Sequence, residues 1–164
     1  MTTDIENAIR IATPDDYQEL MRICYLLWLD NGQHPWSEEK AKEFIWRGCH
    51  RDNAIVGVIG SSSDIKAVIY LEVMPVYYSD DVQLYEKFAF VRPDSRKSDF
   101  AKRLIYFARR CADETGIDLL IGIISDVKLE AKKRLYHRHL PEGGAWFCYH
   151  GKAKEGENVD ARAA

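Results

Sequence analysis

Hydrophobic and polar residues follow two periods along the first part of the chain, one typical of helices and one of strands. Residues 17–29 carry apolar positions three or four apart, which predicts a helix that begins at Thr13 as cap and Pro14 as first helical residue. Ser37 and the acids after it predict a second helix over residues 38–48. The alternating residues 8–12 predict a short strand ahead of both helices.

The middle of the chain predicts an antiparallel meander. Its three runs rich in β-branched and aromatic residues, 54–60, 65–77 and 82–91, are separated by two polar turns. Pro93 ends the third run, and residues 100–115 predict an amphipathic helix with Gly116 as its stop. The apolar run 117–124 predicts a strand buried on both faces, parallel to the strand that ends at Val91.

The last third predicts one more helix, a strand and a tail. Ser125 and Asp126 precede a helix expected over about residues 128–137, and residues 145–150 predict the last strand. Residues 151–164 hold almost no large apolar side chain, so we expect a disordered tail. We therefore expect a single domain over residues 1–150, of α/β (α+β) class, with a mixed, mostly antiparallel central sheet flanked by helices on both faces.

Composition narrows the class of protein. The 164 residues are 46% hydrophobic and 30% charged, values typical of a globular protein. A formal net charge of −3 argues against a general binder of nucleic acid or membrane surfaces, so we expect neither as a partner. Four scattered cysteines without a C-x-x-C pair, and no apolar stretch of membrane-span length, predict reduced thiols in a cytoplasmic protein without a metal site.

Basic residues gather where the helix over residues 100–115 begins. They are Arg92, Arg96, Lys97, Lys102 and Arg103. The free backbone N–H groups and the dipole of a helix N-terminus favour negative charge, so this segment suits a phosphate. A nucleic-acid surface along residues 92–110 is a weaker interpretation, because a phosphorylated cofactor accounts for the same charges.

The pattern Val91-x-Pro93-x-x-Arg96-x-x-Asp99-x-Ala101 resembles the V-x-P-x-x-[RQ]-x-x-G-x-[GA] signature of the GNAT superfamily of acyl-CoA N-acyltransferases. The resemblance implies that backbone N–H groups of this turn hold the pyrophosphate of coenzyme A. The cofactor-binding residues that it implies are Phe90, Val91, Arg96, Lys97, Ser98, Asp99, Phe100, Ala101 and Lys102. Asp99 replaces the first glycine of the signature, and its carboxylate either occupies the N–H groups itself or points away from them.

The segment from Ala131 to Arg138 resembles the A-x-x-L-Y helix of the same superfamily, with one extra residue between Ala131 and Leu135. The resemblance implies that Tyr136 is the general acid that protonates the leaving thiolate. A phenol with a pKa of about 10 keeps its proton at neutral pH. The alternative is that the ring of Tyr136 only packs against its neighbours.

Two acids lie inside otherwise apolar strands and are candidates for the general base. By two-residue alternation, Glu86 shares a face with Leu84, Phe88 and Phe90, so its carboxyl should be desolvated and its pKa raised. Glu72 is the second candidate. The alternative for both is a solvated strand face or a pair with Lys87.

The loop between the first two helices covers the acceptor site in the superfamily, which makes Asp30, His34 and Trp36 candidate substrate contacts beside Glu72. The alternative is a Trp36 packed under the loop and a solvated His34. The resemblance implies transfer of an acetyl group from acetyl-CoA to a primary amine of a small molecule or protein. A catalytically silent binding or regulatory protein of the same fold is the second hypothesis, and exposed strand edges allow a homodimer.

Overall fold

A computed structural model describes residues 8–123 and 128–144. Along the chain the elements are β1 (Ile9–Ile11), η1 (Pro14–Asp16), α2 (Tyr17–Asn31), α3 (Glu38–Cys49), β2 (Ala54–Ser61), β3 (Asp64–Pro75), β4 (Val82–Val91), η2 (Pro93–Ser95), α4 (Phe100–Thr115), β5 (Asp118–Leu120) and α5 (Leu129–His139). The strand predicted over residues 145–150, the cap predicted at residues 125–126 and the tail lie outside the described residues.

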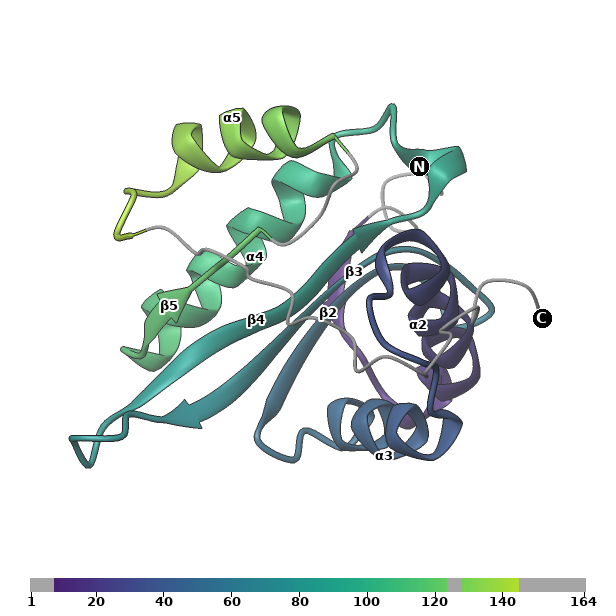
Figure 1. The fold of residues 1–164 in the computed structure, drawn as a ribbon, viewed down its shortest axis with the longest axis horizontal. Coiled ribbons are helices and arrows are strands. Elements are labelled where there is room, and N and C mark those ends of the chain that lie inside the picture. Colours follow the sequence, from purple (N-terminus) through teal and green to yellow (C-terminus); the bar gives the residue numbers. More distant parts are fainter. Residues whose placement is uncertain (1–7, 124–127, 145–164) are drawn as a thin grey trace, which may run out of the picture.

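The described strands form one mixed sheet in the order β1-β2-β3-β4-β5 (Figure 1). Neighbouring strands from β1 to β4 are antiparallel, and β5 is parallel to β4. This arrangement confirms the predicted fold class, because the meander is followed by a helix and a parallel return strand.

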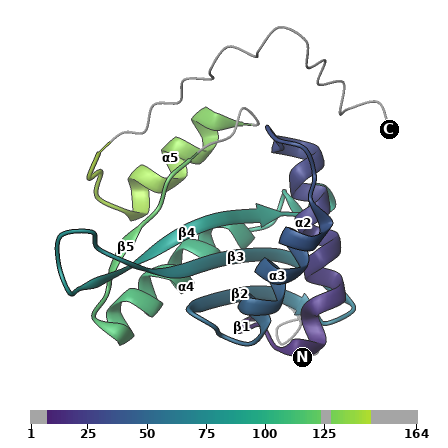
Figure 2. The ribbon, with the colours of Figure 1, turned by 60° about the horizontal axis from the view of Figure 1, so that its bottom comes forward.

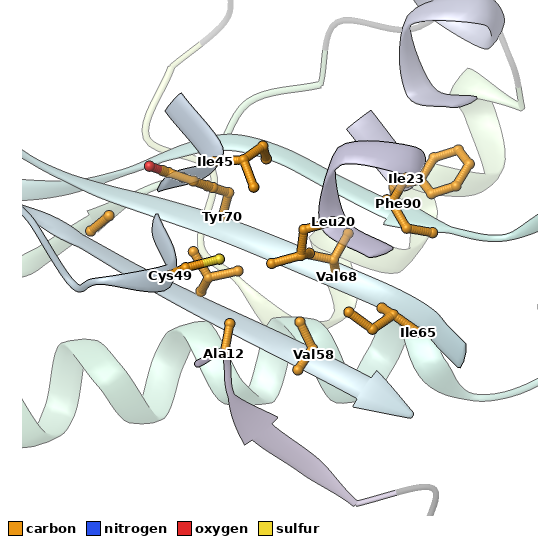
Figure 3. Packing of buried hydrophobic residues seen from close by; sticks show 12 residues of the cluster. Ala12, Leu20, Ile23, Ile45, Cys49, Val58, Ile65, Val68, Tyr70 and Phe90 are labelled. Atoms are coloured by element: carbon orange, nitrogen blue, oxygen red, sulfur yellow. The ribbon is translucent and has the colours of Figure 1, made fainter. Parts of the chain in front are cut away.

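Helices cover both faces of the sheet, with α2 and α3 on one side and α4 on the other (Figures 1 and 2). The core is correspondingly divided. One cluster lies between the sheet and α2 and α3, where Figure 3 shows Ile45 beside the ring of Tyr70, Leu20 beside Val68, and Ile23 beside Phe90. The second cluster lies under α4, whose apolar side chains are buried against the opposite face of β3 and β4.

Two glycines let the helices approach the sheet. A Cβ on Gly57 of β2 would lie 2.6 Å from the Phe107 ring of α4. A Cβ on Gly48 of α3 would also lie 2.6 Å from the Tyr70 ring, whose hydroxyl donates to the carbonyl of Phe44 at 2.9 Å. Side chains at either glycine would push a helix off the sheet.

β5 is shorter than the sequence predicts. The apolar run 117–124 suggests a long strand buried on both faces, but β5 spans only Asp118–Leu120 and Leu120 is 37% exposed. Within the described part of the chain, it pairs with Gln83, Leu84 and Tyr85 of β4. The described residues after β5 pack under α4 or line a cavity. They are therefore apolar because they are buried, although they are not paired in the sheet.

The N-terminal turn is fixed by a buried ion pair. Asp16 is fully buried, and its carboxylate accepts bonds of 2.7 and 2.8 Å from Arg10 and one of 2.7 Å from the backbone N–H of Thr13. Burial by itself raises the pKa of Asp16, but these hydrogen bonds outweigh it and lower the pKa to about 2. The pair joins β1 to the start of α2.

Replacing Asp16 by Ala should lower the free energy of unfolding at pH 7 by about 3 kcal/mol, because Arg10 loses its partner. Glu38→Ala, which breaks the exposed pair between Glu38 and Lys42, is the control and should change stability little. Urea unfolding measures both. The contribution of Asp16 should be present above its unfolded pKa and should disappear as the pH falls toward about 2; equal effects of the two variants would contradict this role.

Candidate active site

A cavity of about 660 Å³ opens where β4 and β5 separate. Its walls come from the C-terminal half of α2, the second half of β4, the start of α4 and the inner face of α5. The residues that line it are Cys24, Leu27, Trp28, Asn31, Gly32, Trp36, Ile69, Tyr85, Glu86, Lys87, Phe88, Ala89, Phe90, Val91, Arg96, Ser98, Ala101, Leu104, Ile105, Gly122, Ile123, Lys128, Ala131, Lys132, Leu135 and Tyr136.

A β-bulge at Lys87 sets the direction of the Glu86 side chain. Tyr70 pairs with Phe88 and Leu71 pairs with Glu86, so Lys87 has no opposite residue on β3. Side chains opposite each other in a ladder share a face, and the extra residue therefore reverses the alternation. Glu86 lies on the α4 side of the sheet with Leu71, whereas Phe88 lies on the α2 side with Tyr70. The expectation that Glu86 shares a face with Leu84, Phe88 and Phe90 was right for Leu84 and wrong for Phe88 and Phe90.

Glu86 is nevertheless buried in the cavity wall, with 9% of its surface exposed. Its Oε2 has no hydrogen-bond partner among the described residues, while the backbone N–H of Gly122 donates to the carboxylate. Burial raises the pKa of Glu86 to about 8, against the opposing effects of the Lys132 charge and the Gly122 hydrogen bond. An acid with a pKa near neutrality, in contact with a cavity, is suited to accept and release protons.

Tyr136 and Lys132 of α5 face the cavity from the opposite wall, one helical turn apart. Burial raises the pKa of the Tyr136 hydroxyl well above its ordinary value, and the charge of Glu86 adds to the increase. Burial lowers the pKa of Lys132, and so does the positive charge of Arg96. The phenol therefore keeps its proton, and a titratable carboxyl and a cation lie close to it.

The Asp99 side chain does not cap the start of α4, where the backbone N–H of Phe100 donates to Ser98 Oγ at 3.3 Å. Asp99 occupies the N-cap position, but its side chain makes no capping hydrogen bond and instead pairs with Arg103, Oδ1 to Nε, at 2.9 Å. The N–H of Arg103 is the first to bond within the helix, to the carbonyl of Asp99. Of the two alternatives for this carboxylate, the structure has the second: it points away from the N–H groups. Ser98 and Ala101 of this turn line the cavity.

Arg96 does not stand free at this turn. Its Nη2 bonds Asp30 Oδ2 at 2.6 Å, and its Nε donates to the carbonyl of Val91 at 3.3 Å. The sequence pattern places Asp30 in the loop after the first helix, but Asp30 belongs to the last turn of α2. One ion pair therefore connects the end of α2 to the turn before α4, at the rim of the cavity.

The remaining candidates for cofactor binding divide into two groups. Phe90 and Val91 line the cavity, as expected. Lys97 and Phe100 instead border a smaller hollow of about 330 Å³ on the other side of the turn. Lys102 lies on the exposed side of α4, with its Nζ 5.5 Å from the centre of the Tyr106 ring. The basic residues of the motif therefore do not converge on one point.

Of the residues predicted to contact the acceptor, some line the cavity and others do not. Trp36 lines the cavity, whereas His34 is exposed and is not part of the lining. Glu72 is outside the lining as well, because its carboxylate pairs with Arg47 and Lys87 at 3.1 Å each. For Glu72 the alternative of a pair with Lys87 is the one observed.

Sequence reasoning did not single out Trp28 or Lys132 as site residues, although the position of each in the sequence indicated that it could line the site. Trp28 lies on the same face of α2 as Cys24, four residues earlier, next to the loop that was expected to cover the site. Lys132 lies four residues before Tyr136 and so shares its face of α5. Gly122 had no signal, because its contribution is a backbone N–H.

No family model and no curated protein matches the sequence. Solved structures do match the fold. A possible acetyltransferase from Clostridium difficile 630 superposes with a TM-score of 0.68 at 13% identity, over 90% of this chain and 97% of that one. A predicted acetyltransferase with acetyl-CoA from Clostridium acetobutylicum gives 0.67 at 15% identity, over 87% and 95%. AAC(6')-Iy, in complex with the bisubstrate analogue CoA-S-monomethyl-acetylneamine, gives 0.67 at 15% identity, over 89% and 98%.

The chain thus has the fold of the GNAT acetyltransferases, in agreement with the resemblance found in the sequence. Two of these structures hold acetyl-CoA or a coenzyme A analogue. Within the described residues, no group of His, Cys, Asp and Glu side chains could hold a metal ion. None of the described helices combines the length and the hydrophobicity needed to cross a membrane.

Glu86→Gln should stabilise the folded protein increasingly as the pH rises from 5 to 8. The unfolded state loses the Glu86 proton near the ordinary glutamate pKa of 4.5 and the folded state only near about 8, so wild-type stability falls between these values. Gln has no proton to lose. Thermal midpoints of both proteins at several pH values measure the difference, and a difference that does not change with pH would show that Glu86 titrates normally.

Proposed function

We propose that this protein transfers an acetyl group from acetyl-CoA to a primary amine by direct attack within a ternary complex. The observation that carries the proposal is that two groups meet in one cavity: the buried Glu86 carboxyl, whose Oε2 has no hydrogen-bond partner among the described residues, and the protonated Tyr136 hydroxyl. These are the base and the acid that amide formation from a thioester requires.

The residues around the cavity fit acetyl-CoA. The first turn of α4 supplies backbone N–H groups that the Asp99 side chain leaves open, and Ser98 and Arg96 stand beside them. These groups would hold the pyrophosphate. Beyond Tyr85, β4 has no β5 partner among the described residues, so the backbone at Phe90 and Val91 can bond the extended arm of the cofactor. Bound acetyl-CoA supplies the activated acetyl group as a thioester.

The proton transfers balance with two side chains. Glu86, once ionised, takes a proton from the acceptor ammonium, directly or through water, and leaves a neutral amine. A carbon–nitrogen bond forms as the carbon–sulfur bond breaks. Tyr136 gives its proton to the departing thiolate, and the second proton that the amine nitrogen loses as the amide forms returns to the Tyr136 oxygen. A backbone N–H near Ala89 to Val91 would bond the thioester oxygen as negative charge develops there.

The pairings of Glu72 support Glu86 over Glu72 as the base. Glu72 is not part of the described cavity lining, and its carboxylate is already paired with Arg47 and with Lys87. The orientation of Asp99 likewise supports an active enzyme over a silent relative. Of the two positions expected for its carboxylate, the one that would obstruct the phosphate site is not the one observed, because the carboxylate is bonded to Arg103. We further propose a single domain over residues 1–150 and a cytoplasmic location; a homodimer stays a prediction.

The logarithm of kcat/KM should rise with pH and level off near the Glu86 pKa of about 8, because only the carboxylate accepts a proton. Glu86→Gln should remove this limb and lower kcat/KM at the plateau by about a hundredfold. Lys132→Met should move the limb to higher pH, because the Lys132 charge lowers the pKa of Glu86. Release of free coenzyme A thiol measures all three. A limb that persists in Glu86→Gln would exclude Glu86 as the base.

Tyr136→Phe should lower kcat by about a hundredfold and leave the affinity for acetyl-CoA unchanged, because the ring stays while the proton donor is lost. Tyr106→Phe is the matched control: Tyr106 is 44% exposed on α4 and is not part of the cavity lining. The account would be contradicted if both variants kept wild-type kcat.

A further inference from the structure

The acceptor side of the cavity is an aromatic wall. Trp28 and Trp36 line it, with ring centres 5.8 Å apart, and Tyr25 packs 5.6 Å from Trp28 and 5.3 Å from Trp36. Trp28 Nε1 donates to the carbonyl of His34 at 2.8 Å. This bond fixes the loop after α2 and uses the polar atom of the Trp28 ring. What remains for a ligand is the ring surface, which suits a flat apolar body.

The volume limits the size of the acceptor. A cavity of about 660 Å³ is in the range that holds one drug-sized molecule, roughly 300–1,000 Å³. If the protein has the proposed function, the cavity must hold the arm of acetyl-CoA as well as the amine. The share left for the amine suits a single ring with a short side chain and not a molecule of several rings.

The charge of the lining limits the number of ammonium groups. Among the described residues of the lining, Glu86 is the single acid, and four residues are basic: Lys87, Arg96, Lys128 and Lys132. Asp30 and Glu72 offset two of these cations at the rim, but both acids are already paired. One carboxylate can receive one ammonium. A second or third ammonium would have no counter-charge in the described lining and would meet like charges.

From these three observations we infer that the acceptor is a small monoamine with a flat aromatic body, such as an arylalkylamine, and that polyamines and aminoglycosides are poor acceptors. The inference rests on the proposed function and specifies its substrate class. It separates this chain from AAC(6')-Iy, the structural neighbour whose bisubstrate analogue contains acetylneamine. The aromatic ring would stack on Trp36 and Trp28 while the ammonium reaches Glu86.

The test is a comparison of acceptors. With acetyl-CoA, kcat/KM for phenylethylamine should exceed that for spermidine and for neamine by at least about tenfold, the ratio expected from one aromatic contact. Trp36→Ala should raise KM for phenylethylamine by about tenfold for the same reason. Trp46→Ala is the matched control, since Trp46 is stacked on His50 on the outer side of α3 and is not part of the lining. It should leave KM unchanged.

Direct binding separates the inference from the reaction. Calorimetric binding of phenylethylamine that Trp36→Ala weakens, without turnover, would support the aromatic site and contradict acetyl transfer. Turnover of neamine or spermidine in preference to phenylethylamine would support acetyl transfer and overturn the aromatic site. An equal KM in wild type and Trp36→Ala, or the absence of any phenylethylamine binding, would also overturn it.

Discussion

A carboxyl group buried in the sheet without a full set of partners is the constraint on which the site depends. The single extra residue at Lys87 turns Glu86 toward the α4 face, into the opening where β5 leaves β4. Without the bulge, the side chain would enter the predominantly apolar core under α2, where burial of a charge is costly. In its observed place the carboxylate accepts one backbone hydrogen bond, while Oε2 has no partner among the described residues. The pKa of Glu86 is raised because the carboxylate is buried and only partly hydrogen-bonded.

The cavity is also the place where three separate parts of the chain meet. Arg96 joins the turn before α4 to Asp30 at the end of α2, and the pKa of Lys132 on α5 responds to both charges. A phosphate beside Arg96 would therefore act on the end of α2 and on α5 together. Trp28 and Trp36 belong to the same end of α2 and its loop, so the residues proposed to hold the cofactor and those proposed to hold the acceptor line one cavity.

The sequence predicts the fold well and the site only in part. The bounds of α4 follow from its amphipathic period and from Gly116, which has a φ of 68° at the helix end. The side of the sheet on which the Glu86 side chain lies could not be predicted from a two-residue alternation. It depends on a bulge, and a bulge is a property of the pairing between β4 and β3 and not of the β4 sequence alone. The length of β5 was overpredicted for a related reason: apolar residues that line a cavity have the composition of a buried strand.

The motif residues show the same limit. Arg96 was identified by its spacing in the signature, but its pair with Asp30 joins residues 66 positions apart and depends on the packing of α2. Asp99 could be placed at the helix start from the sequence, whereas the choice between capping the N–H groups and pairing with Arg103 is made by side-chain geometry. Tyr136 was found by resemblance, and the cation one turn before it by the structure.

The most direct measurement is a calorimetric titration of the full-length protein with acetyl-CoA, carried out in parallel on Asp99→Gly. The account predicts saturable binding of one molecule with a micromolar Kd, nearly equal in the two proteins, because the Asp99 carboxylate is bonded to Arg103 and leaves the helix N-terminus open. No binding at millimolar acetyl-CoA, or binding that appears only in Asp99→Gly, would contradict it.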